Sequence, residues 1–444
     1  MTASGDHVGQ TLTEGLWAVA SRPATNADRA RAALHLLDWL GCAIAGASTS
    51  TGRAIAPDIR PFAASGAAGA TAMGGLGSMF EMDDVHRTAL LHPGPVVIPA
   101  VLALVDQAPD ADLLGAILAG YEAMVRLGAA VGPGHYAFFH NTGTCGGIGS
   151  AAAAARMLGL TDTQAIWAMG HAVSTAGGLW QCRNEPCATK HLHVAEAARR
   201  GVQAALWAKA GLAGPRQILE GPQGFFAVMA HDGDPAAVLA GPDAWRIHEV
   251  SFKPWPACRH AHPTIDAALK LRADLQGRAI AAIRVKTFAD AILFCDRPDP
   301  QTEGQAKFSL QHSVAVTLAL GPPVLADFTP QRLADPKLAH LRALTKVSMD
   351  PDLTARYPAH FGAVVEIDTA DGKHLSVHVA DALGDSENPL DAAALMAKFH
   401  ALTAHAGLGK AEAERLADAA LALASGASAE PLRAALAALT FPAA

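Results

Sequence analysis

Histidines gather in four segments of this 444-residue sequence, at residues 82–94, 135–144, 189–193 and 252–263. These segments lie between the periodic apolar stretches, where loops at helix ends collect functional groups on a rigid scaffold. Histidine has an unperturbed pKa near 6.5, which suits it to acid and base chemistry near neutral pH. The pattern therefore predicts one acid–base site that is assembled from four parts of the chain.

Three cations, Lys190, Lys253 and Arg259, lie within the same segments. Cations beside acid–base groups indicate a substrate with two or three carboxylates to neutralise. Each residue also has an ordinary explanation when it is taken alone. A loop histidine is usually a surface or capping residue, Lys190 can lay its stem along a helix, and Asp83 and Asp84 can cap one. Only the combination favours a site.

Metal binding is the alternative use for these histidines, because His-x-His occurs at 191/193 and at 260/262. However, HExxH is absent and the carboxylates are not interleaved with histidines at ligand spacing. The six cysteines include no CxxC pair, so neither a zinc ribbon nor a ferredoxin-type cluster is indicated. We therefore expect no metal and no other cofactor.

Residues 143–149 form a glycine run, GTCGGIG, that lacks both GxGxxG and the P-loop GK[ST] pattern. We expect a tight loop there that caps a helix starting at 149. Its backbone N–H groups at a helix N-terminus, together with Thr144, are candidates for holding a substrate carboxylate. Cys145 and Cys258 are candidate nucleophiles, with small buried packing residues as the ordinary alternative.

Composition bounds the class of protein. Hydrophobic residues make up 51% and charged residues 17% of the chain, and alanine is abundant, which favours closely packed helices and an oligomer. The net charge of −7 argues against a nucleic-acid partner. No basic stretch precedes an apolar run near the N-terminus, and the apolar run at 96–105 is too short to span a bilayer. We expect a cytoplasmic protein with reduced thiols and no membrane partner.

Periodicity predicts a mainly helical chain with an α+β insert. The apolar pattern changes near residue 253, and residues 280–288 then alternate as a half-buried strand does. Two further runs flank Asp371-Gly372, a hairpin turn signal, and helical periodicity returns from 391. The predicted domains are an all-helical one, 1–252 with 386–444, and an α+β one, 253–385. The helices expected in the first part are 26–46, 99–107, 113–127, 149–158, 161–172 and 194–210.

Seven stretches of the sequence, taken in order, resemble the MmgE/PrpD family, which includes 2-methylcitrate dehydratase, cis-aconitate decarboxylase and iminodisuccinate epimerase. The resemblance spans nearly the whole chain. It implies an all-helical domain built from both chain ends, a smaller α+β domain, a site between them, no iron–sulfur cluster and usually a homodimer. The stretches are DWLGC at 38–42, MDD with HP at 82–93, 140–160, 189–222, 253–263, KFSLQ at 307–311 and GDSENP at 384–389.

By position, the resemblance implies site roles for six residues: Asp84, His92, His140, Lys190, Lys253 and His262. The catalytic candidates are Asp84, His92, His140, Lys190 and His262. The substrate-binding candidates are Lys253, Arg259, His260, Thr144 and His312. The sequence departs from its relatives at two places, since the decarboxylase has His where Cys258 aligns and many relatives have Tyr where His312 stands.

Removing a proton from carbon next to a carboxylate creates a dianion that nearby cations must stabilise. We predict that His140 or His262 exchanges this proton while the three cations clamp the carboxylates. Another histidine, such as His92, protonates the departing hydroxyl, and Asp84 orients a histidine or bonds a substrate hydroxyl.

The predicted function is a metal-independent hydro-lyase, similar to 2-methylcitrate dehydratase of propionate catabolism, acting on a small di- or tricarboxylate. An epimerase, isomerase or decarboxylase of a related polycarboxylate is the alternative, because all of them share carbanion-like chemistry. A non-catalytic polycarboxylate-binding relative is a further alternative. A fold that hosts many chemistries does not decide among them.

Overall fold

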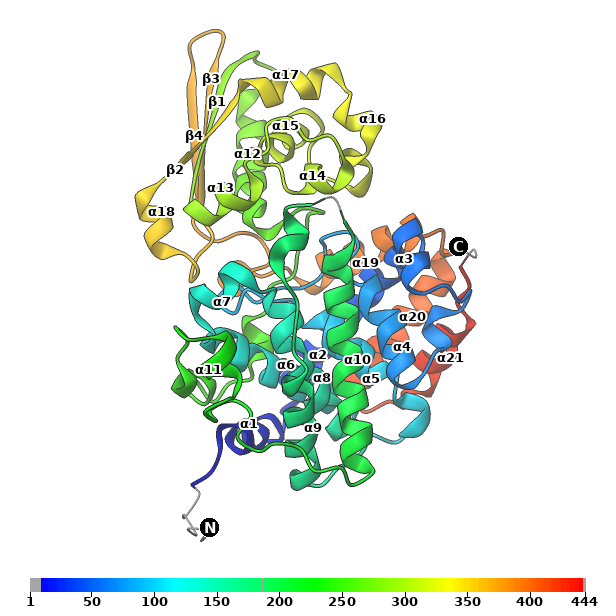
Figure 1. The fold of residues 1–444 in the computed structure, drawn as a ribbon. Coiled ribbons are helices and arrows are strands. Elements are labelled where there is room, and N and C mark those ends of the chain that lie inside the picture. The colour runs from blue at the N-terminus through cyan, green and yellow to red at the C-terminus, as the bar shows by residue number, and fades with distance from the viewer. Residues whose placement is uncertain (1–8, 186, 442–444) are drawn as a thin grey trace. The chain divides into compact units, whose positions relative to one another are not determined.

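The computed structural model describes residues 9–185 and 187–441, and its chain divides into two compact units (Figure 1). The helical unit comprises Met1–Met79, Asp83–Val250 and Ala392–Ala444. The α+β unit comprises Phe80–Met82 and Ser251–Asp391. The predicted fold class is confirmed, because helices dominate and the sheet is confined to the α+β unit.

Alanine-rich helices with short connections build the helical unit. Several of these helices have a threonine at the N-cap, where its hydroxyl accepts a hydrogen bond from a backbone N–H of the first turn. Examples are Thr25 before α2 and Thr161 before α9, each in a capping box. The helices are α1 Leu12–Ala20, α2 Asn26–Ala47, α3 Ser50–Ile55, α4 Gly66–Leu76, α5 Gly94–Leu102, α6 Leu113–Ala130, α7 Gly132–Phe138, α8 Asn141–Met157, α9 Asp162–Ser174, α10 Thr189–Lys209, α11 Phe225–Met229, α19 Ala392–His405, α20 Lys410–Ala422 and α21 Glu430–Ala438.

The glycine run is helical, so the predicted loop at 143–149 is wrong. These glycines lie in α8, where close packing against neighbouring helices leaves no room for a side chain. A Cβ at Gly146 would lie 2.8 Å from Ala197, and one at Gly149 would lie 2.6 Å from Met124. Tertiary packing thus outweighs the low intrinsic helix propensity of glycine. Helix α10 likewise begins five residues before the predicted start at 194, and the N-terminus of α5 precedes the predicted start at 99.

Helices from the two ends of the chain pack together in this unit, because α19 lies against α2. A cation and an anion are buried where they meet, with Lys398 Nζ 2.5 Å from Asp38 Oδ1. Burial raises the pKa of Asp38 to about 6, despite the opposing effect of Lys398. Burying these two charges costs desolvation free energy, and their mutual attraction offsets this cost only while both are present.

The α+β unit contains a four-stranded sheet in the order β2-β1-β3-β4. Strand β1 (Ile280–Thr287) pairs parallel with β2 (Thr345–Met349) and antiparallel with β3 (Ala363–Thr369), which pairs antiparallel with β4 (His374–Val379). The predicted strands and the turn at Gly372 are confirmed, whereas β2 was not predicted. The helices of this unit are α12 His262–Leu275, α13 Ala289–Cys295, α14 Glu303–Lys307, α15 Leu310–Leu320, α16 Pro330–Leu333, α17 Pro336–Leu344 and α18 Pro351–Arg356.

Helix α6 is long and apolar enough to cross a membrane, with a mean hydropathy of 1.4 over 18 residues. However, 94% of this window is buried inside the protein. Its apolar surface packs in the core of the helical unit, as expected for the central helix of a bundle.

The buried pair between α2 and α19 gives a stability prediction. Replacing Lys398 with Met leaves the Asp38 carboxylate buried without its counter-charge, so the free energy of unfolding should fall by about 3–5 kcal/mol. The loss should shrink at acidic pH, because a protonated Asp38 needs no counter-charge. Urea unfolding at several pH values measures this. The matched control is Lys410→Met, whose side chain is 85% exposed and should shift stability by less than about 0.5 kcal/mol. Equal losses for the two variants would contradict the prediction.

Candidate active site

The predicted site residues divide between the two units. The helical unit carries Asp84, His92, His140, Thr144 and Lys190, and the α+β unit carries Lys253, Arg259, His260, His262 and His312. That residues of both groups share one cleft stays a prediction. The contacts inside each unit nevertheless distinguish side chains available for chemistry from those engaged in packing.

His140 occupies the N-cap position of α8, and its ring is 1% exposed. The backbone N–H donates to the carbonyl of Gly178 at 2.8 Å, which fixes the start of the helix. The ring lies over Trp180 with centroids 4.5 Å apart, and its Nδ1 is 3.3 Å from Nδ1 of His193. The second nitrogen, Nε2, is buried and has no hydrogen-bond partner among the described residues. The hydrogen-bonding capacity of this nitrogen is therefore unmet within the described residues.

Burial holds the pKa of His140 well below its ordinary value, and the charges of Lys190, His193 and His92 lower it further. Asp83 opposes this shift. His140 is thus a neutral imidazole rather than a group with a pKa near seven, which the sequence predicts. A bound polyanion would raise this pKa, because it adds negative charge next to the ring.

The side-chain carboxylate that holds His92 belongs to Asp83 and not to Asp84. Its Nδ1 lies 2.9 Å from the carboxylate of Asp83 and 2.8 Å from the backbone carbonyl of Asp84. Both partners are acceptors, so Nδ1 carries the proton and Nε2 is left for acid or base work. The backbone N–H of His92 donates to Thr142 Oγ1 at 3.1 Å, which ties this loop to the first turn of α8.

The carboxylate of Asp84 accepts three hydrogen bonds from its own unit. Oδ2 accepts hydrogen bonds from Tyr121 at 2.6 Å and from His35 Nδ1 at 2.7 Å, while Oδ1 accepts one from the Gly94 N–H at 2.8 Å. A Cβ at Gly94 would lie 2.7 Å from Oδ1, so only glycine lets the start of α5 approach this closely. These contacts favour an anchoring role for Asp84, beneath the loop that carries Asp83 and His92.

Lys190 is the second residue of α10, not part of a loop ahead of the helix as predicted. The N-cap residue, Ala188, forms no side-chain hydrogen bond to the first turn of the helix. A cation at the positive end of a helix dipole is unfavourable unless an anion is close by. The half-buried Lys190 carries a charge that lowers the pKa of His140, so the two residues act on each other electrostatically.

Thr144 lies inside the first turns of α8 and is completely buried. Its hydroxyl lies 2.8 Å from Nε2 of His135, and burial lowers the pKa of that histidine. Its contacts favour packing, and its role as a substrate ligand stays a prediction.

In the α+β unit, Arg259 and His262 are engaged with their own neighbours. Arg259 forms an ion pair with Asp385, donates to the Leu383 carbonyl at 2.9 Å and lies 3.0 Å from His262 Nδ1. His262 Nε2 is 3.1 Å from the Ala257 carbonyl. Because Nδ1 accepts and Nε2 donates, both ring nitrogens of His262 are occupied. Their geometry favours His140 over His262 as the proton-exchanging group.

Buried cations also lie in this unit. Lys253 has a fully buried side chain, with Nζ 3.6 Å from a carboxylate oxygen of Glu81. Lys307 lies over the ring of Phe80 at 4.6 Å, and burial lowers its pKa. Lys307 and Glu81 were not predicted as site residues, although Lys307 belongs to the KFSLQ stretch quoted above.

His312 is a core residue of α15. Its Nε2 lies 2.9 Å from the Asp327 carbonyl, and burial lowers the pKa of the ring to about 4. His260 stacks between aromatic rings and contacts Cys258 through Nδ1 at 3.2 Å. The predicted substrate-binding roles of both residues are untested by these contacts and stay predictions.

Comparison with known proteins adds a family resemblance along most of the chain. The MmgE/PrpD N-terminal domain profile matches residues 17–237, and the C-terminal domain profile matches residues 255–424. Cis-aconitate decarboxylase of Homo sapiens is 30% identical over 293 residues, which cover 61% of this chain and 59% of that protein. The Mus musculus decarboxylase is 29% identical, over 72% of this chain and 68% of its own. The 2-methylcitrate dehydratase of Cupriavidus necator is 29% identical over 47% of this chain and 45% of that protein.

The burial of His140 predicts how stability depends on pH. The folded protein keeps this ring neutral, whereas the unfolded chain protonates it below its ordinary pKa of 6.5. The ring therefore favours unfolding as the pH falls below 6.5, by about 1.4 kcal/mol per pH unit. His140→Gln should remove that contribution and flatten the pH dependence of the unfolding free energy. The exposed His340→Gln is the control. An unchanged slope in the His140 variant would show that this ring titrates normally.

Proposed function

We propose a function from one established premise, that this chain belongs to the MmgE/PrpD family. The proposal is a lyase that acts on a small polycarboxylate at a carbon next to a carboxylate. The observation that carries it is the buried His140, whose Nε2 has no hydrogen-bond partner among the described residues and whose pKa is lowered by the charge of Lys190, in the first turn of α10. The cytoplasmic location, the homodimer and a reaction without a metal, all expected from the sequence, stay proposals.

Decarboxylation is the reaction that we favour, rather than the dehydration expected from the sequence. The decarboxylases named above match a larger share of this chain than the dehydratase does. The proposed substrate is an unsaturated tricarboxylate of the cis-aconitate type. In such a molecule a carboxymethyl group lies next to the double bond, so its carboxylate can leave with allylic stabilisation of the charge.

The chemistry needs a cation and one proton. The bond between the departing carboxylate and its carbon breaks, CO₂ leaves, and the electron pair enters the allyl system. Charge then gathers beside a second carboxylate, where Lys190 and the backbone N–H groups of α10 stabilise it. The His140 ring, protonated in the presence of the polyanion, gives a proton to the carbanion and returns to its neutral form. A proton from water restores it for the next turnover.

Dehydration is the second candidate, because one arrangement specifically suits it. The Asp83–His92 pair holds a histidine through a protonated Nδ1, and no hydrogen bond joins its Nε2 to a described residue. A group of this kind can protonate a departing hydroxyl while His140 takes the proton from carbon. The same residues would then serve a hydroxy acid similar to 2-methylcitrate.

A panel of acids tests the proposed reaction. We expect release of CO₂ from cis-aconitate and no loss of water from 2-methylcitrate, followed by gas detection and by NMR of the products. An unsaturated product from a hydroxy acid without CO₂ would replace decarboxylation with dehydration. Binding without any turnover of the panel would support the non-catalytic alternative.

Replacing Lys190 with Ala tests its proposed role in stabilising the substrate. The loss of a cation that pairs with the substrate in a desolvated site costs about 2–5 kcal/mol, or roughly 30- to several-thousand-fold in kcat/KM. Lys190→Arg should restore little of the lost kcat/KM, because the planar guanidinium group does not replace the compact ammonium group of lysine. Thermal midpoints should stay close to the parent value.

The control for this variant is Lys410→Ala, whose ammonium is exposed at the start of α20. It should leave both the kinetics and the thermal midpoint unchanged. Near-normal kcat/KM in Lys190→Ala would eliminate Lys190 from the site.

A further inference from the structure

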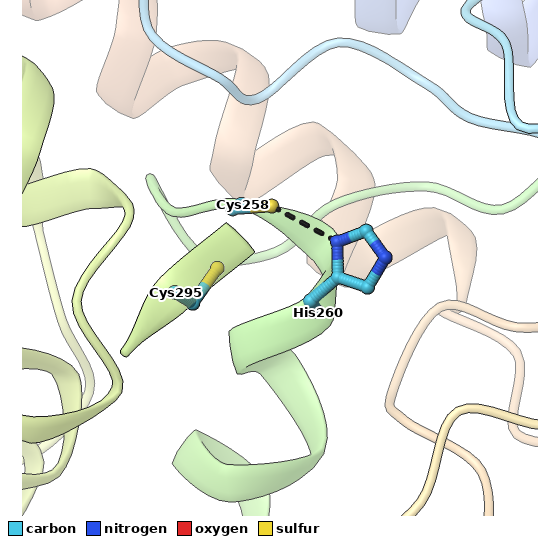
Figure 2. A group of neighbouring side chains, drawn as sticks. All are labelled: Cys258, His260 and Cys295. Atoms are coloured by element: carbon cyan, nitrogen blue, oxygen red, sulfur yellow. Dashed lines mark hydrogen bonds between the residues drawn. The ribbon is translucent and has the colours of Figure 1, made fainter. Parts of the chain in front are cut away.

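Two cysteines and a histidine of the α+β unit turn their ligand atoms toward one another (Figure 2). Cys258 Sγ lies 3.2 Å from His260 Nδ1, and Cys295 Sγ is within 4.8 Å of both atoms. Cys258 and His260 come from one short turn, whereas Cys295 ends α13, 35 residues after His260 in the sequence. All three side chains are buried, with exposures of 7%, 6% and 0%.

Packing fixes the histidine ring in this position. His260 stacks between Phe294 and Phe361, with centroid separations of 5.1 and 5.2 Å and interplanar angles of 4° and 17°. The backbone N–H of Cys258 donates to the Lys307 carbonyl at 2.8 Å, which holds the turn. The Nδ1 atom is therefore aimed at the two sulfur atoms before any ligand binds, as a preorganised site requires.

Weak hydrogen bonds link these atoms, between Cys258 Sγ and His260 Nδ1 and between Cys258 and Cys295, but they satisfy the group poorly. A thiol is a weak donor and a weak acceptor, so the two sulfur atoms satisfy the buried imidazole poorly. The other ring nitrogen, His260 Nε2, is buried with no hydrogen-bond partner among the residues that the structure describes. Three soft or borderline ligand atoms thus lie together in a nearly dry part of the unit, where each would gain from a shared cation.

The separations fit a tetrahedral zinc ion. Zn–S bonds of about 2.3 Å and Zn–N bonds of about 2.0 Å place sulfur and nitrogen roughly 3.5 Å apart and two sulfurs roughly 3.8 Å apart. The Cys258–His260 separation of 3.2 Å and the upper limit of 4.8 Å bracket these values. Two thiolates also balance the charge of a divalent ion, which reduces the cost of burying it.

We propose that Cys258, His260 and Cys295 bind one divalent metal ion of the zinc type, with a fourth position open to water or another small ligand. Thiolate and imidazole ligands select Zn²⁺ over Mg²⁺ or Ca²⁺, which prefer oxygen. The site gives His260 a ligand role in place of the substrate-binding role expected from the sequence. It does not rest on the proposed lyase activity, because His140 and Lys190 take no part in it.

Cobalt titration of the full-length, metal-free protein under reducing, oxygen-free conditions tests the site. We expect one equivalent of Co²⁺ to produce a thiolate-to-cobalt charge-transfer band, and Zn²⁺ to displace it. Cys258→Ala and Cys295→Ala should each weaken binding by more than the roughly 10–100-fold that outer-shell partners contribute. Buried Cys145→Ala, in the helical unit, should leave binding unchanged. So should His360→Gln, which alters a separate cluster of His360, Asp381 and Glu387.

Thiol protection tests the same site in the unaltered protein, should either alanine variant fail to fold. Zn²⁺ should protect Cys258 and Cys295 from alkylation, with peptide mass spectrometry identifying the protected residues, and should leave the exposed Cys187 reactive. The absence of both the cobalt band and this protection would overturn the proposal. So would a band that persists without Cys258 and Cys295, or a Cys258–Cys295 disulfide that forms on oxidation in a protein that binds no metal. None of these readouts depends on lyase activity.

Discussion

An imidazole removed from water holds its proton weakly, and His140 is 1% exposed and feels the charges of Lys190, His193 and His92. Folding thus pays a desolvation cost to keep this ring neutral at the start of α8. An arriving polyanion reverses the electrostatic balance, because it offsets the cation and makes protonation of the ring favourable. In the proposed reaction, the same group of charges binds the substrate and sets the protonation state of the ring.

Glycine makes this arrangement possible. Helix α8 can lie against α5, α6 and α10 because Gly146 and Gly149 leave no side chains between the backbones. This packing brings the start of α8 next to the start of α10, so that His140 meets His193. Beneath the neighbouring loop, the carboxylate of Asp84 ties Tyr121, His35 and the start of α5 together. Asp83 can then hold His92.

Much of the fold follows from periodicity, and the exceptions have physical causes. Strand β1 was predictable because buried Ile283 and Val285 alternate with polar residues, whereas edge strand β2 buries almost nothing and left no such signal. The glycine run was misjudged because propensity carries no information about helix–helix packing. In the site, the sequence identified the Asp83-Asp84 segment but not which carboxylate faces His92. Neighbouring residues project in different directions, and only the folded backbone decides between them.

We propose that His140 moves the proton at the substrate carbon. Turnover in D₂O, followed by NMR of the product, tests it most directly because deuterium reports the carbon that receives the proton. We expect the unaltered protein and the exposed His340→Gln variant to place one deuterium on that carbon. A folded His140→Gln variant should lose both this incorporation and turnover. Full incorporation and turnover in His140→Gln, with loss of both in a folded His262→Gln variant, would contradict the account and transfer the role to His262.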